Sequence, residues 1–250
     1  GGAKNHMIVL PDADIGMAAD AAVSAAYGSA GERCMAVSVV VAVGAVADPL
    51  VEAIENRLPK LQIGPGDQEG SQMGPLITRE HRDRVTSFID KGREAGAEVR
   101  ADGRQHVLYD KESGGFFLGV SLLDNVSPEM ECYRNEIFGP VLEVIRVPTY
   151  TDAVKLINDN AYGNGTAIFT RDGDAARTFA ARANIGMVGV NVPIPVPVAY
   201  HTFGGWKRSG FGDLNQHGPA SIIFYTKVKT VTQRWPAGSH GAEFVIPTMK

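Results

Sequence analysis

The residue of this 250-residue chain that is best suited to do chemistry is Cys34. It lies between an alanine-rich stretch with helical spacing and a run of valines typical of a buried strand. Gly28 and Gly31 precede it and let the backbone approach a ligand closely, while the neighbouring Arg33 favours the nucleophilic thiolate form. The alternative at this point is a small buried apolar side chain, the commoner state of a free cysteine.

The second cysteine and the histidines give weaker signals. Cys132 lies in a segment with little around it to activate a thiol, so we expect it to be structural. The six histidines show no metal-ligand spacing and two cysteines cannot form a four-thiolate zinc site, so no metal is predicted. The glycine clusters match neither a phosphate-binding loop nor a dinucleotide-binding fingerprint.

Composition and charge remove several classes of protein. The chain is long enough for one large domain or two modest ones. Its 24 Lys and Arg against 28 Asp and Glu give a net charge of -4, which argues against a nucleic-acid-binding protein. No stretch approaches the roughly 18 consecutive apolar residues of a membrane helix. Two cysteines fit a reducing compartment, so the cytoplasm is the expected location.

Helical and strand patterns alternate along the chain. The apolar run at 37–43 is typical of a strand that is covered on both faces, as in a parallel sheet. Helices are also predicted at 13–31, 49–61, 78–95, 151–158 and 172–183, and strands at 116–123, 141–147, 166–170 and 187–191. This alternation predicts an α/β fold built on an open, mostly parallel sheet.

The residues at the two ends of the chain give separate predictions. Residues 221–232 are rich in β-branched and aromatic side chains and are predicted to form a strand. Because a lone strand near a terminus needs an edge to pair with, we expect 219–250 to be an oligomerisation strand and tail after a domain over 1–218. The chain starts at Gly1 without an initiator methionine, so we expect it to be part of a longer protein.

Six short motifs follow one another along the chain. They are GERC (31–34), MGPLI (73–77), EIFGPV (136–141), YGNGTAIFT (162–170), VN (190–191) and FGGWKRSGFG (203–212). Each alone is a weak match, but in this order they specifically resemble the C-terminal half of the aldehyde dehydrogenase family. The resemblance implies the three-layer α/β catalytic domain of that family over 1–218. It also implies that the family's N-terminal NAD-binding domain is absent from this chain.

Four further motifs narrow the resemblance. They are GAKNH (2–6), ERCMA (32–36), GVNVPIPVP (189–197) and PTMK (247–250). These are similar to one branch of the family, the CoA-acylating methylmalonate-semialdehyde dehydrogenases. The resemblance implies oxidation of methylmalonate or malonate semialdehyde by NAD, loss of CO₂ and acyl transfer to coenzyme A. The products implied are propionyl-CoA or acetyl-CoA, in valine and inositol catabolism, and the implied parent is a homodimer or homotetramer.

The resemblance also assigns roles to individual residues. Cys34 matches the nucleophile, whose thiolate adds to the aldehyde and ends as a thioester, with its backbone N–H as half of an oxyanion hole. Glu136 matches the residue that holds the nicotinamide ribose hydroxyls, and Phe138 the aromatic residue beside the nicotinamide ring. Arg33 is a candidate for the substrate carboxylate, because a guanidinium fork suits that group, and Phe203 matches a residue of the substrate funnel.

Two alternative functions stay open at this stage. In hydrolytic aldehyde dehydrogenases a glutamate base falls just before the position of Gly1, outside this chain, whereas the acylating branch lacks it. The other alternative is a catalytically silent, oligomerising fragment. It follows from the missing cofactor domain, because hydride transfer needs a nicotinamide held against the reacting carbon.

Overall fold

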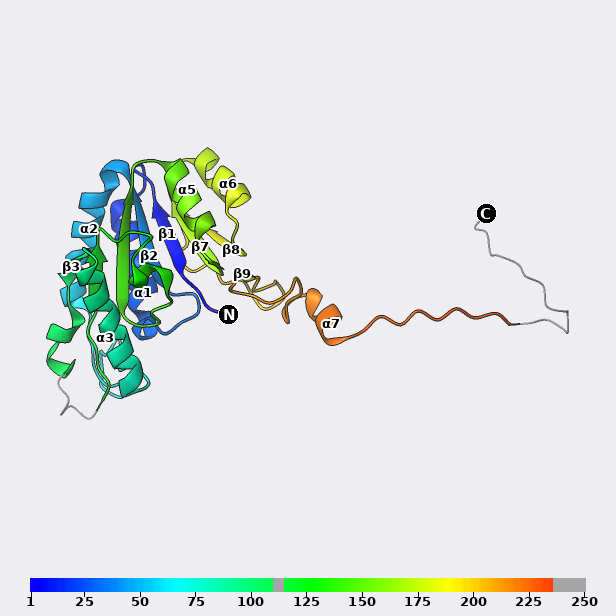
Figure 1. Cartoon of the computed structure of the whole chain (residues 1–250), viewed down its shortest axis with the longest axis horizontal. Coiled ribbons are helices and arrows are strands. Elements are labelled where there is room, and N and C mark those ends of the chain that lie inside the picture. The colour runs from blue at the N-terminus through cyan, green and yellow to red at the C-terminus, as the bar shows by residue number, and fades with distance from the viewer. Residues whose placement is uncertain (110–114, 236–250) are drawn as a thin grey trace.

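A seven-stranded sheet is the framework of the computed structural model, which describes residues 1–109 and 115–235 (Figure 1). The strand order is β3–β4–β5–β2–β1–β7–β8, and every neighbouring pair is parallel except β3 and β4. The strands are β1 (Asn5–Val9), β2 (Val37–Val43), β3 (Glu98–Ala101), β4 (Ser121–Asp124), β5 (Val141–Val147), β7 (Gly165–Phe169) and β8 (Met187–Val190). The predicted open, mostly parallel α/β sheet is confirmed.

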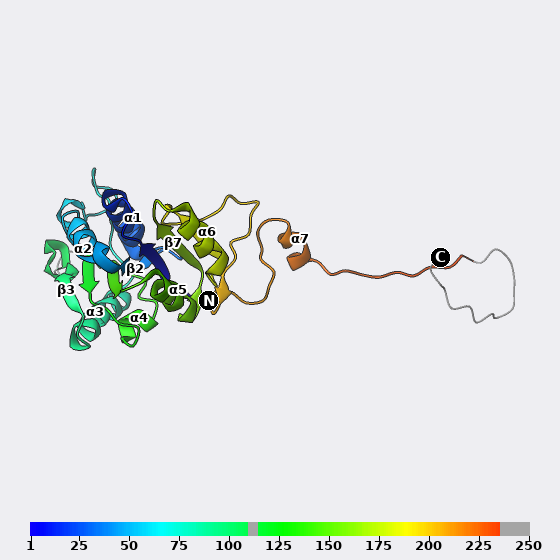
Figure 2. The same ribbon diagram turned by 90° about the horizontal axis from the view of Figure 1, so that it is seen from above.

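Helices cover both faces of this sheet. They are α1 (Ile15–Tyr27), α2 (Ala47–Glu55), α3 (Arg79–Glu94), α4 (Glu131–Arg134), α5 (Tyr150–Asp159) and α6 (Gly173–Arg182). A further helix, α7 (Ala220–Tyr225), has no buried residue and lies away from the sheet (Figure 1). Figure 2 shows α1 and α2 on one face and α5 on the other. The handedness of the connections explains this placement. The units β1–α1–β2 and β5–α5–β7 run along the sheet in opposite directions, and because both crossovers are right-handed their helices lie on opposite faces.

The first predicted helix is shorter than its alanine pattern suggested. It ends at Tyr27, and Gly28–Gly31 form a separate 3-10 turn. Ser29, Ala30 and Gly31 there have φ angles of 52°, 54° and 70°, in the left-handed region that a right-handed helix cannot contain. A change of backbone handedness therefore separates α1 from the residues that lead into β2.

The strand predicted at 221–232 is wrong for this structure. Helix α7 occupies Ala220–Tyr225, and residues 226–235 lead away from the domain without regular structure (Figure 1). Among the described residues no strand lies beside this segment, and a strand without a neighbour has no hydrogen-bonding ladder. Its apolar side chains are exposed, including Ile222, Val228 and Trp235. The motif at 247–250 lies outside the described residues.

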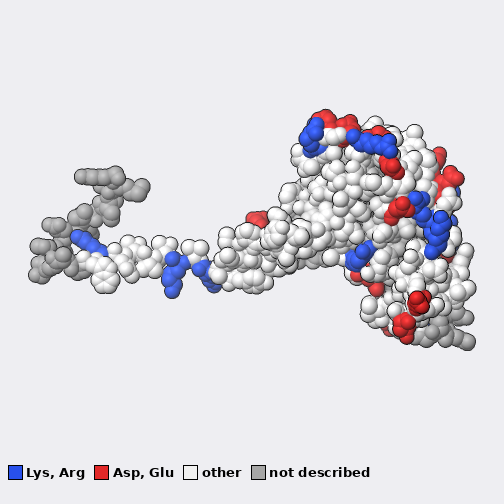
Figure 3. Space-filling view, turned by 180° about the vertical axis from the view of Figure 1, so that it is seen from behind, with Lys and Arg blue, Asp and Glu red and all other residues white. Residues whose placement is uncertain are grey.

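The surface carries mixed charge. In Figure 3 acidic and basic side chains are interspersed over the visible face of the domain. Within the described part of the chain, no helix is both long and apolar enough to cross a membrane.

Buried polar side chains attach β1 to its neighbours. Lys4, just before β1, forms an ion pair of 2.9 Å with Glu143 of β5, and both side chains are completely buried. The Lys4 ammonium also donates to the carbonyl oxygens of Cys132 and Asn135, which keeps this buried charge fully engaged. His6 of β1 is buried with Nε2 3.0 Å from the hydroxyl of Tyr133.

We expect His6 to make the protein less stable in acid. Burial and, next, the charge of Lys4 lower its pKa from 6.5 to about 3, so the unfolded chain binds this proton first as pH falls. The free energy of unfolding is therefore unaffected by His6 above pH 6.5, and it decreases progressively as the pH falls from 6.5 toward about 3. Urea unfolding between pH 7 and pH 4 measures this slope. His6→Gln, which cannot titrate, should flatten it, and an unchanged slope would contradict the assignment.

Candidate active site

The segments that hold Arg33, Cys34, Glu136 and Phe138 converge because each precedes a parallel strand. Residues 28–34, which we call the nucleophile loop after the predicted role of Cys34, lead into β2, and the 136–140 loop leads into β5. Residues 1–4 lead into β1, and Asn164 directly precedes β7. Because parallel strands begin at the same edge of a sheet, these segments meet at the amino ends of β5, β2, β1 and β7.

Cys34 combines an exposed side chain with a firmly held backbone. Its carbonyl oxygen accepts hydrogen bonds from the side-chain amides of Asn5, at 3.0 Å, and Asn164, at 2.9 Å. Asn5 also donates to the carbonyl of Ala36 and accepts from the N–H of Gly165, so one buried amide joins β1, β7 and the entry to β2. A nucleophile needs such fixed placement together with access to its substrate.

Asn5 and Asn164 are site residues that the sequence analysis did not single out. Both lie within motifs that it quoted, at 2–6 and 162–170, so a signal was present. Nothing in the spacing, however, indicated that two amides so far apart in the chain bind the same carbonyl oxygen. The two hydrogen bonds can form together only because β1 and β7 pair side by side.

Arg33 is folded back onto the end of α1. Its Nη2 donates to the carbonyl oxygens of Ser24, at 3.0 Å, and Ala25, at 2.9 Å. A cation there neutralises the partial negative charge of a helix C-terminus. The guanidinium also covers Gly28, where an added Cβ would lie 2.6 Å from Nη2. Burial lowers the pKa of Arg33, and its assignment to a substrate carboxylate stays a prediction.

Helix α3 holds the 136–140 loop by its backbone. Arg84 donates to the carbonyl oxygens of Glu136, at 2.8 Å, and Ile137, at 2.9 Å. His81, one turn earlier, places Nε2 2.6 Å from the carbonyl oxygen of Phe138. Three successive carbonyls are thus bound by one face of α3. Phe138 has a left-handed φ of 60° and is 38% exposed.

Glu136 and Phe138 are brought close to the nucleophile loop. The Glu136 Oε1 accepts from the backbone N–H of Ala3 at 3.0 Å. Arg33, Glu136 and Phe138 line one small cavity with residues of the β1 and β2 entries. Phe203 is not part of that lining, and its ring instead lies 4.4 Å from the ring of His217. The structure therefore gathers Arg33, Glu136 and Phe138 at this cavity, whereas neither Cys34 nor Phe203 is part of its lining.

The nucleophile loop and the 136–140 loop touch backbone to backbone. A Cβ added at Gly31 would lie 2.2 Å from the carbonyl oxygen of Gly139. On its other side Gly139 packs against Val85 of α3, where an added Cβ would come within 2.6 Å. Glycine is required at Gly31 for both space and a φ of 70°.

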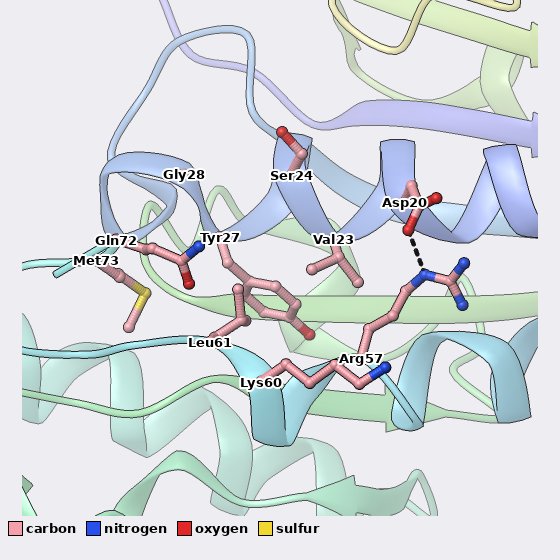
Figure 4. A pocket seen from close by; sticks show the side chains of 10 residues that line it. All are labelled: Asp20, Val23, Ser24, Tyr27, Gly28, Arg57, Lys60, Leu61, Gln72 and Met73. Carbon is pink, nitrogen blue, oxygen red and sulfur yellow. Dashed lines mark hydrogen bonds and ion pairs between the residues drawn. The ribbon is translucent and has the colours of Figure 1, made fainter. Parts of the chain in front are cut away.

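A larger hollow of about 340 Å³ lies beside α1, with Gly28 in its lining (Figure 4). Asp20 and Arg57 form an ion pair of 2.5 Å at it. The residues that line it are Asp20, Val23, Ser24, Tyr27, Gly28, Arg57, Lys60, Leu61, Gln72 and Met73. None of the predicted site residues belongs to this lining.

Cys132 is a structural thiol, as expected. It is buried, and desolvation together with the charge of Glu143 raises its pKa to about 12. Within residues 1–109 and 115–235, no group of three His, Cys, Asp or Glu side chains is arranged to hold a metal ion.

Alkylation should distinguish the two thiols. At pH 8 we expect iodoacetamide to modify Cys34 at least about tenfold faster than Cys132, because only Cys34 is exposed and the buried thiol remains protonated. Peptide mass spectrometry after timed quenching measures both rates, with Cys34→Ser and Cys132→Ser as matched controls. Faster modification of Cys132 would count against Cys34 as the nucleophile.

Substitution of Gly31 tests the contact between the two loops. Gly31→Ala should lower the free energy of unfolding by about 2–4 kcal/mol, because the new Cβ meets the Gly139 carbonyl and strains a left-handed backbone. Gly74→Ala is the matched control, since nothing lies within 4 Å of an added Cβ there. Denaturant unfolding measures both, and equal stabilities of the two variants would refute the contact.

Comparisons with known proteins show the family and agree with the fold. The model of the aldehyde dehydrogenase family matches residues 1–231. A malonate-semialdehyde dehydrogenase of Pseudomonas aeruginosa is 54% identical, over 100% of this chain and 50% of its own length. An acylating, mitochondrial methylmalonate-semialdehyde/malonate-semialdehyde dehydrogenase of Bos taurus is 45% identical, over 99% of this chain and 46% of its own length.

Solved structures are similar over the same region. A methylmalonate-semialdehyde dehydrogenase of Oceanimonas doudoroffii has a TM-score of 0.91 at 55% identity, covering 95% of this chain and 49% of its own. An aldehyde dehydrogenase of Mycobacterium tuberculosis complexed with NAD⁺ has a TM-score of 0.83 at 31% identity, covering 90% of this chain and 45% of its own. The chain thus spans about half the length of the relatives it matches. On the family match, the identities and the shared fold, this chain belongs to the aldehyde dehydrogenase family.

Proposed function

We propose that this chain is the catalytic part of an NAD-dependent, CoA-acylating methylmalonate- or malonate-semialdehyde dehydrogenase. The observation that carries the proposal is an exposed Cys34 thiol on a loop whose backbone is held by Asn5 and Asn164. The loop with Glu136 and Phe138 lies against it. The Bos taurus relative is named as an acylating enzyme for both semialdehydes, which favours this reaction over hydrolysis.

The chemistry begins at the sulfur of Cys34. Its thiolate adds to the aldehyde carbon, and the backbone N–H of Cys34 stabilises the negative oxygen that forms. NAD supplies the hydride acceptor when bound. Loss of hydride from the tetrahedral carbon leaves an acyl group on the sulfur as a thioester. Loss of CO₂ leaves a carbanion at the α-carbon of the acyl group, and this carbon takes up a proton. Coenzyme A loses its thiol proton and attacks the thioester carbon, which forms the acyl-CoA and breaks the bond to sulfur, so that Cys34 is released as a thiolate.

The residues around Glu136 fit a ribose. One carboxylate oxygen, Oε1, already accepts from Ala3. A Cβ at Gly2 would lie 3.3 Å from the other, Oε2, so the glycine keeps space beside that oxygen. A carboxylate oxygen accepts hydrogen bonds from hydroxyl donors such as those of the nicotinamide ribose. Phe138 then offers its half-exposed ring to the nicotinamide.

Arg33 and Phe203 are proposed to select the substrate. A semialdehyde of this class carries a carboxylate, and a guanidinium is suited to bind it. The bonds from Arg33 to Ser24 and Ala25 hold the guanidinium in one orientation at the end of α1. Phe203 is proposed to line the approach of the aldehyde in the complete protein.

The wider organisation is part of the same proposal. Residues 1–218 are the catalytic domain, the NAD-binding domain lies outside this chain, and 219–250 assemble a cytoplasmic homodimer or homotetramer. The exposed apolar side chains of the tail, such as Ile223 and Val231, support a role in assembly. A catalytically silent fragment remains the second candidate for the chain alone, because it spans only half of its relatives.

An assay of the parent protein tests the proposed reaction. With malonate semialdehyde and NAD, we expect sustained NADH formation only when coenzyme A is present. Cys34→Ala should lower the rate at least about a thousandfold, because it removes the nucleophile, whereas Cys132→Ala should retain it. Equal turnover without coenzyme A would overturn the acylating assignment in favour of hydrolysis. Sustained turnover by the 250-residue chain itself would refute the silent-fragment alternative.

A further inference from the structure

Glu32 and His81 form a contact that none of the proposed roles uses. The Glu32 Oε1 lies 3.3 Å from Nε2 of His81, and their side chains are only 10% and 22% exposed. Burial raises the pKa of Glu32, and the charge of His81 and a hydrogen bond from the backbone N–H of Ile77 act in the opposite direction. The carboxylate of the nucleophile loop is therefore directed toward the start of α3.

The same nitrogen of His81 also reaches the 136–140 loop. Nε2 is 2.6 Å from the carbonyl oxygen of Phe138, and the two rings lie 6.3 Å apart. Because both neighbours of Nε2 are acceptors, this nitrogen must carry a hydrogen. It does so in the imidazolium and in one neutral tautomer, so both contacts can persist in either charge state.

His81 is itself anchored within the first turn of α3. Its backbone N–H donates to the side chain of Thr78, the residue that caps the helix. The two loops that it contacts meet each other at Gly31 and Gly139, and each contains left-handed non-glycine residues, Ala30 in one and Phe138 in the other. Strained segments of this kind keep their conformation only when several surrounding contacts hold them in it.

We propose that His81 is a positioning residue that fixes the spacing between the nucleophile loop and the 136–140 loop, by sharing one N–H between Glu32 and the Phe138 carbonyl. The catalytic consequence rests on the proposed function. The thiol of Cys34 and a nicotinamide held at Glu136 and Phe138 stay at a constant separation. The structural linkage itself needs neither NAD nor substrate.

Amide hydrogen exchange of the ligand-free chain tests the linkage directly. His81→Ala should raise the exchange rates of 29–34 and of 136–139 together, by about five- to tenfold. His81→Gln, which keeps an N–H donor, should restore at least part of the protection. Glu80→Gln is the matched control, because it changes a neighbouring exposed residue of α3 and should leave both segments unchanged.

A double-mutant cycle separates coupling from general loosening. Glu32→Ala should raise exchange in 29–34, and adding His81→Ala should raise it there no further, because both variants remove the same contact. Additive effects, or a change in 136–139 alone, would overturn the proposal. Exchange rates that also rise uniformly in β2 would indicate loss of global stability and would equally count against it.

Kinetics of the parent protein provide the functional readout. His81→Ala should lower kcat by about tenfold with a smaller change in KM for the aldehyde, and His81→Gln should recover part of the loss. A parent that does not oxidise semialdehydes would overturn the proposed function, yet the exchange result would still decide the linkage. An active parent with unchanged kcat in His81→Ala would overturn the positioning role alone.

Discussion

The close approach of two backbones, at Gly31 and Gly139, is the constraint on which the rest of the site depends. With an added Cβ only 2.2 Å from a carbonyl oxygen, no side chain can separate the nucleophile loop from the 136–140 loop. The left-handed turn over Ser29, Ala30 and Gly31 ends α1 and places Gly31 at this contact. Backbone strain at the turn is tolerated because hydrogen bonds to Cys34 and Ala36 hold the segment that follows.

The parallel sheet converts distant segments into one site. Since β5, β2, β1 and β7 are neighbours and run in the same direction, the residues before each of them gather at one edge. The buried side chain of Asn5 at this edge forms hydrogen bonds with the backbone of neighbouring segments, at Ala36 and Gly165. The Lys4–Glu143 ion pair adds a buried charge that is stable only because both partners are present.

Sequence periodicity predicted the elements well where packing follows the local pattern. The valine-rich run at 37–43 is the buried β2, and alternating helices and strands correctly indicated an open, mostly parallel sheet. The pattern failed at 221–232, where strand-forming residues lack a neighbouring strand and part of the segment is the short helix α7. A strand is a property of two segments, so propensity in one of them cannot decide it.

The sequence by itself determined the family and the fold class, and it singled out Cys34 as the predicted nucleophile, since ordered motifs and local periodicity are carried by neighbouring residues. It did not reveal that Asn164 and Asn5 bind one carbonyl oxygen, or that Arg33 covers the end of α1. Nor did it link Glu32 to His81. These contacts join segments that are distant in the chain or depend on a left-handed turn, and only the pairing of the strands and the direction of the backbone bring their atoms together.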